Sequence, residues 1–269
     1  MTTYTKVQKK ELRQLLDFGY IVEKTKTEYE VIRLRGNGAV MILFTSNKLL
    51  VQGKEESVKA VEALFSELKI GKKVIPIKFA KEEGVVIGSD ESLKGDSFGG
   101  IVVAAVKAND DQRRDLLFAG VMDSKKLDDN EIFIIAQRVK KVVEYKVISM
   151  MPEEYNKYDG VTEILNKLHN QVITELRPCD MAITDKYPGC KVKAKMETKA
   201  ESKYVEVAAA SILAREAAIK QLQKLSKRIG FELPKGSTHV AEALKKAASK
   251  VNLKTVAKLH FKNVQKFLL

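Results

Sequence analysis

From Gly84 onwards the chain alternates short apolar segments with longer amphipathic ones, and this alternation restricts the folds that it can adopt. Residues 85–88 and 101–106 are nearly continuous runs of apolar, mostly β-branched residues, which is typical of strands buried on both faces. Gly-rich sequence joins these two segments and favours an antiparallel pair. The whole region therefore predicts an α/β fold.

The remaining segments predict a mixed five-stranded sheet covered by helices. They follow in the order β-β-β-α-β-α-β-α, and we expect crossovers to join the later strands. The strands are predicted at residues 85–88, 101–106, 116–120, 142–150 and 181–184. The helices are predicted at residues 129–140, 161–176, 201–229, 240–249 and 253–268.

The N-terminal region has a pattern of its own and predicts a small α+β unit. Its first apolar residues recur at helical spacing and stop at Gly19, a residue suited to end a helix. We expect a domain at residues 1–69, a linker with Gly and Pro at 70–83, and a second domain at 84–269. In the first domain, strands are predicted at residues 28–35, 39–44 and 49–51, and a second helix at 55–68.

The net charge of +13 is concentrated towards the two ends of the chain. Residues 215–269 hold 13 Lys or Arg against three Glu, and residues 1–80 hold 15 basic and nine acidic residues. A single Lys-rich helix is usually a solvated face. Two basic regions around a nearly neutral middle instead favour a polyanionic partner such as a phosphate backbone.

The sequence contains no segment typical of membrane insertion or secretion. No apolar run approaches the ~18 residues that span a bilayer, and the N-terminal residues lack the apolar stretch of a secretion signal. We therefore expect a cytoplasmic protein with no membrane partner. Cys179 and Cys190 match no zinc-binding spacing, and we expect them to be reduced thiols.

Four acidic residues predict the functional site. Asp90 and Glu91 follow the first apolar strand, Asp185 follows the last one, and Glu201 opens a long helix. Sites of α/β proteins tend to lie beyond the carboxyl ends of strands, so a compact fold can bring these acids together. Clustered carboxylates repel one another unless hard cations compensate, so the cluster predicts divalent metal. Two such ions could activate a water and stabilise the departing oxygen in phosphodiester hydrolysis.

Other interpretations of these segments are weaker, although any single acid could be a solvated carboxylate or a helix cap. Leu93 stands where a phosphate-binding loop needs its second glycine, which argues against a nucleoside triphosphatase. His169, His239 and His260 form no pair at ligand spacing, and satisfied hydrogen-bonding histidines are the simpler interpretation. His169 could still serve as a substrate or proton contact.

The adjacent pair Asp90 and Glu91 presents a geometric difficulty. Neighbouring residues of a strand point to opposite faces, so both can face one cleft only if the strand becomes irregular after Asp90. The Ser-Leu-Lys-Gly segment at residues 92–95 could provide that break.

Several motifs of the second region occur in the order found in one enzyme family. They are GSDESLKGDSFGG, VMDSKKL, YNK, KLHNQ, TDKY, TKAESKYVEVAAASILARE, LPKGS and KLHF. Together they resemble bacterial ribonuclease HIII from about Gly84 to the end of the chain. The N-terminal unit resembles that family's small substrate-binding domain, which is similar to the TATA-binding protein.

This resemblance implies a ribonuclease H-like fold and an endoribonuclease that cuts the RNA strand of RNA/DNA hybrids. It implies two Mg²⁺ or Mn²⁺ ions and products with 5′-phosphate and 3′-hydroxyl ends. We expect a monomer, because one chain already supplies both the nuclease and its substrate-binding domain. By the same resemblance, the catalytic and metal-binding carboxylates are Asp90, Glu91, Asp185 and Glu201. The substrate-binding residues are Lys94, Gly95, Ser124, Lys125, His169 and Asn170, with Ser124 and Lys125 as phosphate contacts and Asp123 as a structural residue.

One position departs from the family pattern. Leu93 stands where the family usually has a glycine, in a turn whose backbone approaches the ribose 2′-hydroxyls. A leucine adopts fewer backbone conformations than a glycine, so the loop and the cleavage preference could differ. Two alternatives stay open: ribonuclease HII-like cleavage at single ribonucleotides in duplex DNA, and a non-catalytic nucleic-acid-binding protein. Glu201 and the extra N-terminal domain favour ribonuclease HIII, and the presence of all four carboxylates argues against the non-catalytic alternative.

Overall fold

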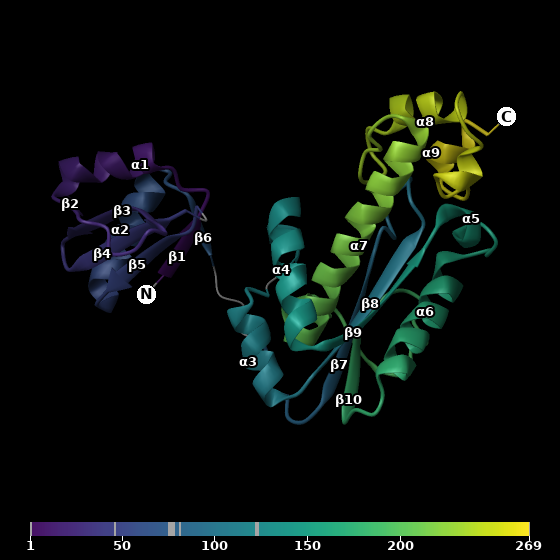
Figure 1. Ribbon diagram of the computed structural model, residues 1–269, viewed down its shortest axis with the longest axis horizontal. Helices are drawn as coiled ribbons and strands as arrows, with labels where there is room; N and C mark the ends of the chain where they lie inside the picture. The colour runs from purple at the N-terminus through teal and green to yellow at the C-terminus, as the bar shows by residue number, and fades with distance from the viewer. Residues whose placement is uncertain (1, 46, 75–78, 81, 122–123, 269) are drawn as a thin grey trace. The chain divides into compact units, whose positions relative to one another are not determined.

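The computed structural model describes residues 2–45, 47–74, 79–80, 82–121 and 124–268. The chain divides into two compact units, Met1–Pro76 and Ile77–Leu269 (Figure 1). This division falls within the segment 70–83 that the sequence marks as a linker, where residues 75–78 and 81 lie outside the described part. No helix in the described ranges is long and apolar enough to cross a membrane.

The first unit contains a six-stranded antiparallel sheet with the strand order β2-β3-β4-β5-β1-β6. Both predicted helices and the three predicted strands are present, and Gly19 ends the first helical segment in the left-handed conformation, at φ 81°. The elements are β1 Thr2–Thr5, α1 Lys9–Arg13, η1 Gln14–Phe18, β2 Ile21–Glu23, β3 Glu30–Gly36, β4 Ala39–Phe44, β5 Leu49–Gly53, α2 Glu55–Glu67 and β6 Lys72–Val74. Strands β1, β2 and β6 have only three or four residues, too few for a periodic pattern in the sequence.

The second unit contains the expected mixed five-stranded sheet, with the order β11-β10-β7-β8-β9. Strands β7, β8 and β9 are antiparallel neighbours, as predicted for the first two, whereas β7, β10 and β11 run parallel. The strands are β7 Val86–Ser92, β8 Ile101–Ala108, β9 Glu144–Met150, β10 Met181–Asp185 and β11 Lys195–Glu197.

The strand predicted at residues 116–120 is wrong. Leu116 belongs to helix α3, Asp110–Phe118, and the fifth strand is β11 instead. The helix begins with a capping box in which the Asn109 side chain accepts from the Gln112 nitrogen and the Gln112 side chain accepts from the Asn109 nitrogen. This local capping stabilises a helix where the short apolar run alone favours a strand.

Helices cover both faces of this sheet: α7, Val205–Ile229, lies on one face and α6, Val161–Leu176, on the other (Figure 1). Helix α7 approaches β7 closely because Gly88 has no side chain, and a Cβ there would lie 2.4 Å from the Val207 nitrogen. The contact fixes α7 against the strand that carries Asp90. The other helical segments are η2 Ser124–Lys126, α4 Asp129–Val142, α5 Pro152–Tyr155, η3 Ala200–Ser202, α8 Ala241–Ala248, η4 Leu253–Thr255 and α9 Lys262–Gln265.

Two predicted helices are interrupted in the structure. The helix predicted at 201–229 is divided, because η3 forms a separate turn around Glu201 before α7 begins. The helix predicted at 253–268 contains only η4 and α9. The residues between these two pair with the loop after β7: the Lys258 nitrogen donates to the Ser97 oxygen at 2.9 Å, and Phe98 forms a bridge with Ala257. Tertiary pairing overrides the helical periodicity of this segment.

Candidate active site

The acidic pair lies near the end of β7, where the strand remains regular. Asp90 pairs with Ala104 and Glu91 with Val103, and the pairing continues through Ser92. The strand is therefore still regular at Glu91 and ends at Ser92, so the irregularity expected at residues 92–95 begins at Leu93. Side chains alternate between the two faces along β7. Asp90 therefore lies on the α7 face, as Gly88 does, and Glu91 lies on the α6 face, as Ser89 does. Both still line one cavity, because they lie at the rim of the sheet.

The break in β7 comes at Leu93, which has φ 68°. This left-handed conformation costs a residue with a Cβ roughly 1–2 kcal/mol. The Leu93 side chain is only 5% exposed and packs into the core that contains Leu222. Burying a leucine contributes roughly 1.5–3 kcal/mol, which offsets the strain. Leu93 therefore adopts the backbone conformation for which a glycine is usually required.

The Asp90 carboxylate has hydrogen-bond donors but no cation against it among the described residues. Its Oδ1 accepts from the Glu91 nitrogen at 2.8 Å, and Ser211 of α7 is a second partner. Burial raises the pKa of Asp90 well above its usual value, and the negative charges of Glu91 and Asp185 add to this effect. The environment therefore disfavours the ionised form.

Glu91 is placed differently. The Lys94 ammonium lies 3.0 Å from its Oε1, and Nε2 of His169 lies 3.3 Å from its Oε2. Burial raises the pKa of Glu91, but the hydrogen bonds and charges of His169 and Lys94 outweigh it and leave the pKa below its ordinary value. Glu91 is thus held as a carboxylate.

Asp185 and Glu201 meet on the α7 side of the sheet. Asp185 ends β10, and its Oδ1 accepts from the Ala200 nitrogen at 3.0 Å, which ties it to the turn that carries Glu201. Burial raises the pKa of Asp185, and the charges of Glu201 and Glu91 raise it further. Glu201 is only 8% exposed; its Oε1 accepts from Lys125 at 3.1 Å. Its buried Oε2 has no hydrogen-bond partner among the described residues.

These four carboxylates interact electrostatically, but they do not form a closed metal site. Within the described ranges, no three acid, histidine or cysteine side chains are arranged to hold a metal ion. The donor set nevertheless suits a hard cation. Asp90 and Asp185 have raised pKa values, and Glu201 has an unpaired buried oxygen, so positive charge is deficient around each of these three carboxylates.

A cavity of about 340 Å³ opens beside the acidic pair. Ser211 and Arg215 line it from one face of α7, and Lys235 lines it from the segment after that helix. Sequence reasoning missed these three residues, although Ser211 and Arg215 lie four positions apart in the quoted AAASILAR motif. The other lining residues are Asp90, Glu91, Ser92, Leu93, Asp96, Ser124, Lys125, Ala218, Ile219 and Leu222.

Comparison with known proteins supplies the family. A model described as Ribonuclease HII matches residues 87–188 and 178–264. The chain belongs to the ribonuclease HII family. Ribonuclease HIII of Streptococcus agalactiae is 32% identical over 88% of each chain, and ribonuclease HIII of Bacillus licheniformis is 33% identical over 93% of this chain and 91% of that one. A crystal structure of Bst-RNase HIII in complex with Mn²⁺ matches with a TM-score of 0.62 and 27% identity, over 98% of this chain and 97% of its own.

These matches confirm the predicted resemblance to ribonuclease HIII and the ribonuclease H-like fold. The protein is accordingly a ribonuclease H. The family model begins only at residue 87, whereas the Bst-RNase HIII structure matches almost the whole chain and so includes most of the first unit. The matched relatives therefore share both units of this ribonuclease.

The expected substrate residues occupy several environments in this ribonuclease. Ser124 is buried and its Oγ lies 2.8 Å from Oγ of Ser211, while Lys125 is exposed and pairs with Glu201. Lys94 pairs with Glu91, and Gly95 after it is exposed. Asp123 lies outside the described residues.

The two residues expected on α6 are less accessible. His169 has no exposed surface, and its ring contacts Ser89, Thr184 and Glu91. The Asn170 side chain binds the Lys193 nitrogen at 2.8 Å and the Asn166 oxygen at 2.7 Å. The structure thus connects His169 to the Glu91 carboxylate and Asn170 to the loop before β11.

Proposed function

We propose that the protein is an endoribonuclease that hydrolyses the RNA strand of RNA/DNA hybrids with two Mg²⁺ or Mn²⁺ ions. The observation that carries the proposal is the deficit of positive charge around Asp90, Asp185 and Glu201, at the carboxyl ends of the parallel strands β7 and β10. A buried carboxylate oxygen without a partner is costly in a stable fold, and a divalent cation would remove that cost. The family membership supports the same function.

The proposed roles of the residues follow from their places. Asp90, Glu91, Asp185 and Glu201 would hold the cations. When bound, the cations supply an activated water and stabilise the departing oxygen, which leaves 5′-phosphate and 3′-hydroxyl ends. The side chains of Lys94 and Lys125, each paired with one of these carboxylates, reach the rim of the site and would bind backbone phosphate as the cations take their place.

Beyond the carboxylates, Arg215 and Lys235 add positive charge along the cavity. They would attract the phosphate backbone towards an otherwise acidic centre. We assign hybrid binding also to the basic N-terminal region and expect a monomer that acts in the cytoplasm.

Asp185→Asn tests the proposal because it removes one negative charge and little contact area. Cleavage of an RNA/DNA hybrid with Mn²⁺ should fall below detection, while the Kd for the hybrid in Ca²⁺ should change less than about threefold. Asp159→Asn, an exposed acid outside the cavity, should leave both quantities unchanged. Retained cleavage by Asp185→Asn would exclude Asp185 from the mechanism.

The choice of substrate separates the alternatives. The wild-type protein should cut a continuous hybrid, and exclusive cleavage at a single ribonucleotide in duplex DNA would favour ribonuclease HII-like specificity. Hybrid binding without cleavage under any metal condition would favour a non-catalytic nucleic-acid-binding protein.

A further inference from the structure

His169 is a buried histidine in direct contact with a catalytic carboxylate. It lies on α6 with no exposed surface and packs against the neighbouring strands β7 and β10. Its Nδ1 is 2.9 Å from the Ser89 hydroxyl and 3.3 Å from the Thr184 hydroxyl. Its Nε2 is 3.3 Å from Oε2 of Glu91. Both ring nitrogens are therefore occupied by protein groups.

The partners of the ring determine which nitrogen donates. An ionised carboxylate only accepts hydrogen bonds, so Nε2 must carry the hydrogen that points to Glu91. In a neutral ring Nδ1 is then an acceptor, and the Ser89 or Thr184 hydroxyl can donate to it. Ser89, His169 and Glu91 thus form a chain of hydrogen bonds with one direction, and the chain fixes the tautomer as well as the orientation of the ring.

The same chain limits the motion of Glu91. His169 holds Oε2 from inside the protein, and Lys94, which is partly exposed, holds Oε1 from the rim. A substrate phosphate can draw the lysine away, whereas the histidine stays packed beside Tyr187, with ring centroids 5.7 Å apart. Glu91 would keep its orientation when the lysine leaves.

We propose that His169 is a positioning residue that orients the Glu91 carboxylate for the divalent cation and does not itself contact substrate. This proposal rests on the metal-dependent function proposed above. Outer partners of a ligating carboxylate typically change metal affinity or activity by about 10–100-fold when they are removed. His169 meets the geometric condition for such a partner, because its hydrogen bond reaches a ligand oxygen from a buried and rigid position.

Two variants of His169 separate positioning from packing. His169→Leu fills similar space without a donor, whereas His169→Gln keeps an N–H group at a distance from the backbone similar to that of Nε2. Titration of the hybrid-free protein with Mn²⁺ alone, by calorimetry, should show affinity about 10–100-fold weaker in His169→Leu and largely restored in His169→Gln. Equal affinities in the two variants, whether both weakened or both unchanged, would overturn the positioning role.

A double-mutant cycle with Glu91→Gln adds a test that a packing defect would not pass. In the Glu91→Gln background, His169→Leu should cause no further loss of Mn²⁺ affinity, because the carboxylate that it orients is already gone. An equal loss in both backgrounds would assign His169 to packing alone. Ser89→Ala keeps the ring and removes the nearer of its two Nδ1 partners, and it should weaken Mn²⁺ binding a few-fold even if His169→Leu fails to fold.

The wild-type titration distinguishes failure of this proposal from failure of the proposed function. Mn²⁺ binding by the wild-type protein with unchanged binding by His169→Leu and Ser89→Ala would overturn the positioning role only. A wild-type protein that binds no Mn²⁺ and does not cut hybrids would overturn both proposals.

Discussion

Two groups of acids, one next to helix α7 and one within it, differ in how their charge is compensated. Three of the four proposed catalytic acids, Asp90, Asp185 and Glu201, have fewer cationic partners than their burial requires, whereas Glu91 pairs with Lys94. The structural acids, Glu206 and Glu216, are almost fully buried, at 1% and 2% exposure, and each pairs with a basic side chain. Burial alone therefore does not distinguish a site from a scaffold in this protein. The basic partners differ: among the described residues Asp90 and Asp185 have no ion pair, whereas each structural acid has at least one.

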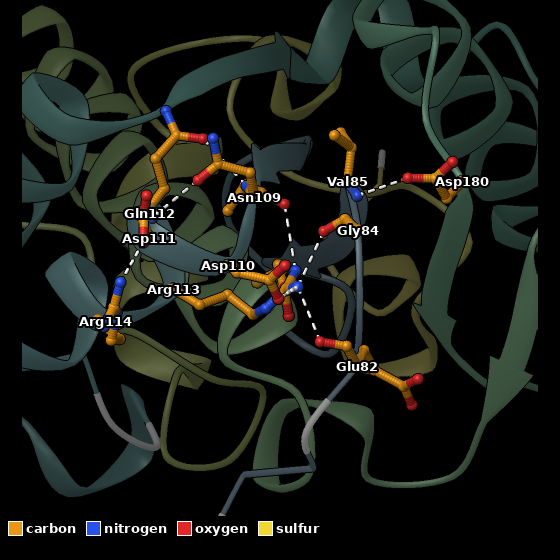
Figure 2. Close-up of polar contacts among 12 residues, drawn as sticks. Glu82, Gly84, Val85, Asn109, Asp110, Asp111, Gln112, Arg113, Arg114 and Asp180 are labelled. Atoms are coloured by element: carbon orange, nitrogen blue, oxygen red, sulfur yellow. Dashed lines mark hydrogen bonds and ion pairs between the residues drawn. The ribbon is translucent and has the colours of Figure 1, made fainter.

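The two structural acids are compensated by basic side chains to different degrees. Arg113 donates to Glu206 at 2.9 Å and to the backbone oxygens of Glu82 and Gly84 at 2.8 Å each, and Figure 2 shows it turned towards those carbonyls. Glu216 accepts from Lys140 at 2.7 Å and from Lys220 at 2.5 Å. At Glu216 the two lysines outweigh burial and leave the pKa below its ordinary value, whereas at Glu206 burial outweighs Arg113 and leaves the pKa raised. An additional cation would therefore gain little at Glu216.

The largest expected effect comes from neutralising a catalytic acid. Asp90→Asn keeps the shape and the acceptor for the Glu91 nitrogen but removes the charge. Hybrid cleavage should fall by roughly a thousandfold or more. The free energy of unfolding in EDTA at pH 8 should rise by about 1–2 kcal/mol, because burial disfavours the ionised carboxylate.

Urea denaturation with EDTA checks the stability part of this prediction, and a hybrid cleavage assay with Mn²⁺ checks the activity part. A variant that is both inactive and less stable would place Asp90 among the structural acids and contradict the comparison.

Removal of the cation from a structural acid should have the opposite effect on stability. Arg113→Met would leave Glu206 buried without its cationic partner, and would also leave the carbonyls of Glu82, Gly84 and Ala108 without this donor. Breaking a buried ion pair in this way costs about 3–5 kcal/mol. Urea denaturation of the two variants Arg113→Met and Arg114→Gln provides the test.

Arg114 is the matched control, because it lies next to Arg113 and its ion pair with Asp111 is exposed. Arg114→Gln should leave the free energy of unfolding unchanged within error. Similar losses of unfolding free energy in the two variants would mean that burial of an ion pair does not determine its contribution to stability.

The sequence predicts the long elements of this fold better than the short ones. Helix α6 begins and ends where its periodicity predicts, at Val161 and Leu176. Strand β11 has three residues, Lys195–Glu197, without an apolar run, and its position depends on pairing with β10. In the segment predicted as a helix at 253–268, hydrogen bonds with residues 97–99, which are remote in sequence, interrupt the helix.

The residues of the site also differ in how well the sequence predicts them. The four carboxylates could be named from the sequence because they end apolar strands or begin a helix. Arg215 and Ser211 could not, because the face that α7 turns towards the cavity is set by its contact with Gly88. The chemistry of His169 was recognisable, but its burial against Glu91 depends on how α6 packs on the sheet. Sequence patterns thus identify reactive groups, and packing decides what those groups face.

Metal should stabilise the catalytic acids in a way that depends on pH. Because the pKa of Asp90 is raised in the folded protein, the folded state binds more protons than the unfolded state between the ordinary value of 3.8 and the raised one. Stability without metal therefore falls as pH rises through this window. Mn²⁺ at a hundred times its Kd should add about 2.7 kcal/mol to the free energy of unfolding, and the Kd itself should increase as pH falls.

Thermal or urea denaturation of the wild-type protein with and without Mn²⁺, from pH 5 to pH 8, measures this stabilisation. Asp90→Asn should lose most of it at every pH. Stabilisation by Mn²⁺ that is independent of pH would show that the cation does not compete with protons at these carboxylates.

The smallest expected effect, at Glu216, has the opposite dependence on pH. Burial raises the pKa of Glu216, but its bonds to Lys140 and Lys220 outweigh burial and leave the pKa below the ordinary value of 4.5. A carboxyl group with a lowered pKa in the fold contributes stability above its unfolded pKa and loses it as pH falls through the folded value.

Glu216→Gln should therefore lower the free energy of unfolding by about 1–2 kcal/mol at pH 7, since both lysines are partly exposed, and by much less near pH 3. Urea denaturation at the two pH values tests this, with Mn²⁺ affinity expected to stay at the wild-type value. A gain in stability at pH 7, as expected for Asp90→Asn, would show that cation pairing does not separate the two groups of acids.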